Sequence, residues 1–283
     1  MKKKILLLLS LWIAAAGLFA QTQTDGKPVA FRTQDGWEIN GIFLAPQAGQ
    51  KTALLLHDIG KNQEAYAAFS AKLKEAGFGY LALDLRGHGK SVNKGDYKAF
   101  AKEGVDNDYN KMTRDVNAAM DYLKGRGVAE ENVVFIGAGL GANVAAKSAS
   151  LWPGIAGLAM LTPLTNLRDV LPIPALRVYK GYTFIACAAD DKKAFLEASL
   201  MRNVAFLSAG EGMVTFATAY DKESHEMLDR WLSAELLQWL KTPQKPELNP
   251  DISQEETPDP YGESYENVAP SATEEALVPS VLE

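Results

Sequence analysis

The sequence predicts an α/β fold in which a mostly parallel sheet is covered by helices on both faces. Apolar runs with the length of buried strands alternate with longer segments whose apolar residues recur at helical spacing. This βαβα alternation is typical of parallel sheets. The chain has 283 residues, of which 47% are hydrophobic and 23% charged, so it can bury the core of one such domain.

The strands come in two groups. Residues 28–33 and 37–44 are separated by Gln34-Asp35-Gly36, a hairpin sequence, and are expected to form an antiparallel edge. Further strands are expected at residues 52–56, 80–85, 132–136, 155–161, 183–188 and 204–207. Apolar stripes predict helices over residues 66–76, 109–123, 142–152 and 228–239. Residues 164–181 are too few for a lid domain, so we expect a minimal lid.

The first twenty residues have the layout of a secretory signal peptide. Three lysines precede an apolar run over residues 5–19, which ends at Ala20 before a polar stretch. A retained anchor is the alternative, but a bilayer crossing needs about 20 apolar residues. We therefore expect an exported protein, periplasmic or secreted, with no stable membrane anchor after cleavage.

The other end, residues 242–283, holds seven of the thirteen prolines, ten acidic residues and one lysine. Such a composition predicts a disordered acidic tail. Its role stays open between a partner-binding segment and a solubilising extension. The folded domain is then residues 21–241, where 25 basic residues balance 25 acidic ones.

Composition excludes several classes of function. The net charge of −6 argues against a nucleic-acid binder. The single cysteine, Cys187, excludes a disulfide framework, and it lies in a predicted buried strand, where it is a poor nucleophile. Three histidines leave little material for a metal centre. We expect neither a metal nor a cofactor.

Polar and glycine-rich residues stand directly after the predicted strands, where ligand sites of parallel sheets collect. His57 and Asp58 follow the first of the parallel strands. Residues 84–91 read Asp-Leu-Arg-Gly-His-Gly-Lys-Ser, and residues 137–141 read Gly-Ala-Gly-Leu-Gly. Asp190 follows a later strand, and His225 precedes the last helix.

Over residues 28–240 this pattern resembles the α/β-hydrolase family, in particular its lidless, dienelactone-hydrolase-like esterases. The order of elbow, acid and histidine matches the family's order, and residues 84–91 are similar to its loop after the fourth strand. The family's elbow reads G-x-S-x-G, with a nucleophilic serine at its centre. Here Gly139 occupies the place of that serine.

The resemblance implies roles for the other residues. His225 matches the catalytic base and Asp190 its acid partner, with Asp191 and Asp169 as alternatives. Asp190 and Asp191 could instead cap the following helix. The backbone N–H groups of Ile59 and Leu140 would form the oxyanion hole, beside which Asp58 would disfavour anionic ligands.

His57 and His88 are interpreted as braces of their loops. Without the serine, no acyl-enzyme can form, and the chain is predicted to be a pseudoenzyme that binds a small molecule or a protein. The alternative is a weak ester hydrolase in which His225 and Asp190 activate a water in the vacated space. A third hypothesis makes the tail the functional part. We expect Gly139→Ser to restore some esterase activity.

Overall fold

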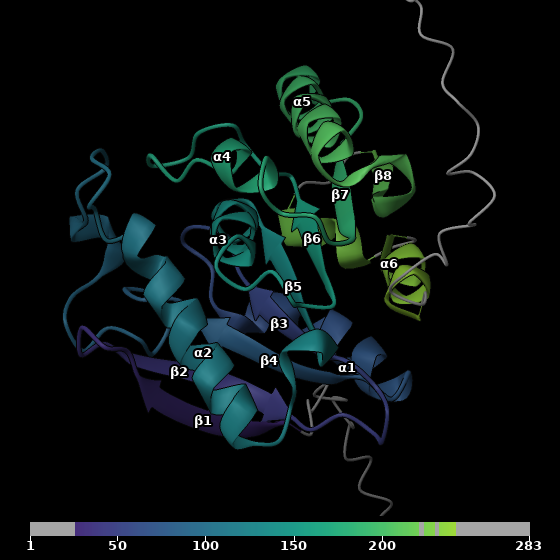
Figure 1. Ribbon diagram of the computed structural model, residues 1–283. Helices are drawn as coiled ribbons and strands as arrows, with labels where there is room; N and C mark the ends of the chain where they lie inside the picture. Colours follow the sequence, from purple (N-terminus) through teal and green to yellow (C-terminus); the bar gives the residue numbers. More distant parts are fainter. Residues whose placement is uncertain (1–25, 221–223, 230–231, 242–283) are drawn as a thin grey trace, which may run out of the picture. The chain divides into compact units, whose positions relative to one another are not determined.

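A mixed eight-stranded sheet forms the centre of the domain (Figure 1), as given by a computed structural model that describes residues 26–220, 224–229 and 232–241. The strand order is β1-β2-β4-β3-β5-β6-β7-β8. β1 pairs antiparallel with β2 and β2 antiparallel with β4, whereas every later pairing is parallel. The predicted fold class is therefore confirmed, including its antiparallel start.

The strands agree closely with the apolar runs of the sequence. They are β1 (Lys27–Arg32), β2 (Glu38–Leu44), β3 (Thr52–Leu56), β4 (Gly79–Asp84), β5 (Val133–Ala138), β6 (Gly157–Leu161), β7 (Thr183–Ala188) and β8 (Val214–Ala219). The strands from β3 to β7 are buried along their whole length, because helices cover both of their faces.

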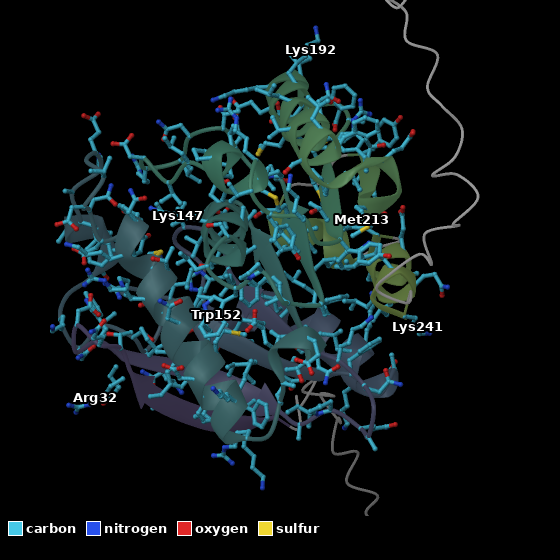
Figure 2. All side chains as sticks on the ribbon, in the orientation of Figure 1. Arg32, Lys147, Trp152, Lys192, Met213 and Lys241 are labelled. Atoms are coloured by element: carbon cyan, nitrogen blue, oxygen red, sulfur yellow. The ribbon has the colours of Figure 1, made fainter. Side chains whose placement is uncertain are left out.

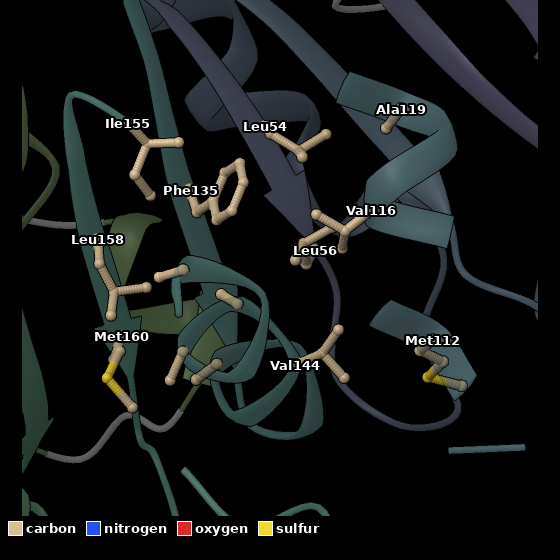
Figure 3. Close-up of a cluster of buried hydrophobic side chains, with 14 of the residues drawn as sticks. Leu54, Leu56, Met112, Val116, Ala119, Phe135, Val144, Ile155, Leu158 and Met160 are labelled. Carbon is tan, nitrogen blue, oxygen red and sulfur yellow. The ribbon is translucent and has the colours of Figure 1, made fainter. Parts of the chain in front are cut away.

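The helices divide between the two faces of the sheet. They are α1 (Ala67–Glu75), α2 (Thr113–Gly125), α3 (Leu140–Ala149), α4 (Ile173–Leu176), α5 (Lys192–Ala209) and α6 (Leu232–Lys241). α2, α3, α4 and α5 contribute to one core cluster, and α1 and α6 to the other. Alternate residues of each strand serve the two clusters: Leu54 and Leu56 face α2 and α3 (Figure 3), whereas Ala53 and Leu55 belong to the opposite cluster.

One predicted strand is wrong. Residues 204–207 lie inside α5, and the strand that follows is β8 at Val214–Ala219. The apolar run resembles a buried strand because α5 carries apolar side chains on its exposed side as well as on its buried side. Leu207 is 83% exposed and Leu196 is 68% exposed. Around Lys192, at the outer end of α5, side chains project in several directions (Figure 2).

The predicted signal peptide, residues 1–20, and the predicted tail, residues 242–283, lie outside the described residues. No helix within the described ranges is both long enough and apolar enough to cross a bilayer.

Candidate active site

The turn between β5 and α3 has the backbone of an elbow and lacks its side chain. Gly139 has φ 52° and ψ −115° and is the N-cap residue of α3. Its N–H donates to the carbonyl of Leu161 at 2.9 Å, and its own carbonyl accepts the N–H of Ala142 at 3.1 Å. Glycine adopts this left-handed conformation without strain, whereas a residue with a Cβ pays about 1–3 kcal/mol there.

Gly141, at the end of the elbow, lies where two backbone segments approach each other so closely that a side chain would not fit. A Cβ on Gly141 would lie 2.0 Å from the carbonyl oxygen of Leu56, at the end of β3. The start of α3 therefore lies directly against the loop that leaves β3. This approach brings Asp58 and Leu140, which are 82 positions apart in the sequence, into hydrogen-bonding contact.

Asp58 points into the predicted oxyanion hole. Its Oδ1 accepts the N–H of Ile59 at 2.7 Å and the N–H of Leu140 at 2.8 Å. These are the two donors that the family resemblance implies, and the structure brings them together on one oxygen. Distances of 2.7–2.8 Å are typical of charge-assisted hydrogen bonds, and they match the geometry with which such donors hold an oxyanion.

The same carboxylate fills the space of the missing nucleophile. A Cβ built on Gly139 would lie 2.1 Å from Cγ and Oδ1 of Asp58 and 2.3 Å from Oδ2. The vacated space that could have held a water therefore holds a carboxylate. The expectation that Gly139→Ser restores activity stays a prediction, and its Cβ would meet the carboxylate of Asp58 in the position that this side chain holds.

The second carboxylate oxygen of Asp58, Oδ2, is bound by Ser224, which in turn bonds to Thr162. The hydroxyl of Ser224 donates to Oδ2 of Asp58 at 3.1 Å, and the N–H of Ser224 donates to Oγ1 of Thr162 at 2.8 Å. Both residues are buried, and both have positive φ, 55° for Ser224 and 48° for Thr162. Such strain persists only where surrounding contacts enforce it. Sequence analysis missed these two residues; the position of Ser224 beside His225 was the one available signal.

His225 lies in the short 3-10 helix η6 (Ser224–Asp229) and is half-buried. Its imidazole is close enough to His57 for its charge to lower the pKa of that residue. Asp190 is exposed and comes just after β7. The pairing of His225 with Asp190 stays a prediction.

The two alternative acids have other partners. Oδ1 of Asp191 accepts the N–H groups of Lys193 and Ala194 at 2.9 and 3.0 Å, so this residue caps α5. Asp169 is half-buried, and its carboxylate accepts the N–H of Gly104 at 2.6 Å.

His57 has a bracing position. It is fully buried, its Nε2 accepts the N–H of Leu85 at 3.0 Å, and its Nδ1–H donates to the carbonyl of Asp58 at 2.7 Å. Burial, followed by the neighbouring His88, lowers the pKa of His57 to about 3, so the ring is neutral. His57 thus ties the loop after β3 to the end of β4.

His88 and Cys187 are also buried. The Nδ1–H of His88 donates to the carbonyl of Arg86 at 2.9 Å, and the ring stacks on Tyr97 at a centroid distance of 4.1 Å. Burial raises the pKa of the Cys187 thiol to about 11, which leaves little thiolate at neutral pH. Within the described residues, no cluster of three histidine, cysteine or acidic side chains could hold a metal ion.

The sheet order, the elbow turn and the paired N–H donors are those of an α/β hydrolase. The family model described as serine aminopeptidase, S33, matches residues 47–192, slightly more than half of the chain. The chain belongs to this α/β-hydrolase family, as the motifs predicted. The matched range includes Asp58, Gly139 and Asp190 but ends before His225.

Solved structures agree with this fold. The esterase Pf2001 of Pyrococcus furiosus is 18% identical, with a TM-score of 0.64 over 76% of this chain and 91% of its own. The esterase domain of a Rhodothermus marinus protein is 15% identical, with a TM-score of 0.57 over 75% of this chain and 96% of its own. A thioesterase domain from the curacin biosynthetic pathway is 10% identical, with a TM-score of 0.56 over 77% of this chain and 99% of its own. No curated protein matches the sequence.

Proposed function

We propose that this chain is an exported, nucleophile-deficient α/β hydrolase that binds a small molecule or a protein and does not catalyse acyl transfer. One observation carries the proposal: the carboxylate of Asp58 occupies the place of the elbow side chain, 2.1 Å from where its Cβ would stand. Gly139 supplies no oxygen to attack an acyl carbon, and both N–H donors of the oxyanion hole are already bonded to Asp58.

The energetic consequence is large. In a serine hydrolase, loss of the nucleophile lowers turnover by roughly a millionfold. Loss of a single oxyanion donor costs about 10²–10³-fold. Because both defects occur together here, ordinary ester hydrolysis falls to the rate of the uncatalysed reaction.

Labelling by a fluorophosphonate probe tests the proposal, together with hydrolysis of p-nitrophenyl acetate by residues 21–241. We expect no labelling, and no hydrolysis above that in buffer. An active serine esterase serves as the positive control. Labelling of the wild-type chain would contradict the proposal.

The weak-hydrolase alternative needs a water, activated by His225 and Asp190, in the space where the carboxylate of Asp58 lies. Because that space is occupied, the binding function is favoured over the hydrolase. Comparison of wild type with His225→Ala separates the two. The binding proposal expects equal, background rates in both proteins. Saturable hydrolysis that disappears in His225→Ala would establish the alternative.

Export and the role of the tail are separate parts of the proposal. Expression of the full chain with its own N-terminus, followed by fractionation and N-terminal sequencing, should give a mature chain that begins near Gln21. Retention of an uncleaved chain in the membrane fraction would contradict export. Once a binding partner has been identified, deletion of residues 242–283 should leave its binding intact; loss of binding would make the tail the functional part.

A further inference from the structure

The elbow keeps its shape without its side chain. Gly139 holds a left-handed conformation through backbone bonds to Leu161 and Ala142, and α3 starts directly after it. None of these contacts depends on the side chain at position 139. The backbone that would present a nucleophile is therefore intact.

The two N–H donors are also in place. Ile59 and Leu140 come from different loops, and their N–H groups converge on a single oxygen atom at 2.7 and 2.8 Å. Such convergence needs the correct backbone in both loops at once. Oδ1 of Asp58 thus stands where the negatively charged oxygen of a reacting acyl group would be held.

A side chain at position 139 would occupy the same space as the observed rotamer of Asp58. A Cβ at position 139 lies 2.1 Å from the carboxyl carbon of Asp58, far inside any carbon–carbon contact distance. A serine at position 139 therefore needs either a smaller residue at position 58 or an Asp58 side chain that turns away and gives up its hydrogen bonds to Ile59 and Leu140.

We propose that Asp58 is a built-in ligand that closes an otherwise assembled acyl-transfer centre, and that positions 58 and 139 are coupled. This inference rests on the proposed function and deepens it. Exchange of both residues, Asp58→Gly with Gly139→Ser, opens the centre to short acyl esters, whereas neither change alone does so. His225, which follows the Ser224 that contacts Asp58, is the base of the reopened centre.

The covalent step in the double variant is a displacement at phosphorus or at an acyl carbon. With a fluorophosphonate, the introduced hydroxyl oxygen bonds to phosphorus, the P–F bond breaks and fluoride leaves. The hydroxyl proton passes to the imidazole of His225. The negative charge on the phosphoryl oxygen is held by the N–H groups of Ile59 and Leu140.

The test compares four proteins: wild type, Asp58→Gly, Gly139→Ser and the double variant. We expect the double variant to be labelled at least about 100-fold faster than Gly139→Ser, since the nucleophile and both oxyanion donors act only there. Asp58→Gly and wild type should not be labelled. Adding His225→Ala to the double variant should remove the labelling.

A matched control keeps the bulk at position 58. In the variant Asp58→Asn with Gly139→Ser, the asparagine has nearly the same volume as the aspartate that it replaces. This variant should stay unlabelled. Asp58→Ala with Gly139→Ser is a second open pair, used if the glycine pair does not fold, with folding checked by thermal unfolding.

Three results would overturn the inference: equal labelling of Gly139→Ser and the double variant, a folded double variant without labelling, or failure of both open pairs to fold. The proposed function fails differently, by labelling of the wild-type chain.

Discussion

The loop after β4 and the loop after β3 leave the same edge of the sheet, yet their charged residues have different partners. In the loop after β4, the guanidinium of Arg86 is fully buried and pairs with Asp115 of α2 at 2.7 Å and with Asp35 of the first hairpin at 2.9 Å. In the loop after β3, Asp58 is bound by backbone N–H groups and a hydroxyl, with no lysine or arginine paired to it among the described residues.

The difference separates a scaffold from a reaction site. Arg86 ties its own loop, which resembles the family's, to the first hairpin and to α2. Asp58 ties together the two N–H groups that would otherwise bind a substrate oxygen and the hydroxyl of Ser224. In this chain, the family-like residues 84–91 hold the fold, whereas positions 58 and 139, which differ from the family's pattern, lie where the chemistry would occur.

The largest loss of stability is expected from a substitution in the loop after β4, which holds Arg86. Arg86→Met leaves Asp115, itself fully buried, without its cation, and should lower the free energy of unfolding by about 3–5 kcal/mol. Urea denaturation followed by circular dichroism measures this. Arg114 is the matched control: it bonds the same Asp35 at 3.0 Å but is 45% exposed, so Arg114→Ala should cost less than about 1 kcal/mol. Equal costs for the two variants would remove the distinction between the loops.

A second effect should appear on acidification. The pKa of His57 is lowered to about 3, first by burial and then by His88, and burial also lowers the pKa of His88. The unfolded chain binds protons near pH 6.5, where the folded chain does not, so stability falls as pH decreases below 6.5.

Between pH 6.5 and 5, the contribution of His57 to the slope should approach about 1.4 kcal/mol per pH unit. Urea titrations of wild type and His57→Gln at several pH values measure it. The variant should show the shallower slope; parallel curves would show that His57 does not titrate in this way.

A smaller effect is expected at the strained pair beside the site. Ser224→Ala removes the hydroxyl that donates to Asp58 at 3.1 Å while the backbone bond to Thr162 stays, and should cost about 1–2 kcal/mol. Ser208→Ala is the control, since that hydroxyl donates to the carbonyl of Arg177 in an exposed position. Thermal or urea unfolding compares the two. A cost at Ser224 no larger than that at Ser208 would mean that Asp58 does not depend on the hydroxyl.

Most of the fold could be predicted from the sequence because buried parallel strands are continuous apolar runs. Residues 52–56 and 183–188 were predicted with the bounds that β3 and β7 have. The prediction failed at residues 204–207, where exposed apolar residues of α5 imitate a core strand. An apolar run in the sequence indicates a buried segment only when the exposed residues of the protein are polar. In α5, several exposed residues are apolar.

The positions of the candidate site could be named from the sequence, whereas the contacts between them could not; that they form a functional site stays a prediction. Glycine at position 139 and the donors at Ile59 and Leu140 follow from motif positions. That the carboxylate of Asp58 turns inward and fills the vacated space could not, because side-chain direction depends on how closely two loops approach. Positive φ at Ser224 is likewise a tertiary property, with no local sequence signal.

The central claim, that the side chain of Asp58 fills the elbow, is tested most directly by a double-mutant cycle of unfolding free energies at positions 58 and 139. Gly139→Ser should be costly in the wild-type background and cheaper by about 1–3 kcal/mol in the Asp58→Gly background, because the collision is then gone and only backbone strain remains. An equal cost of Gly139→Ser in both backgrounds would show that the two side chains do not compete for one space, and would contradict the account.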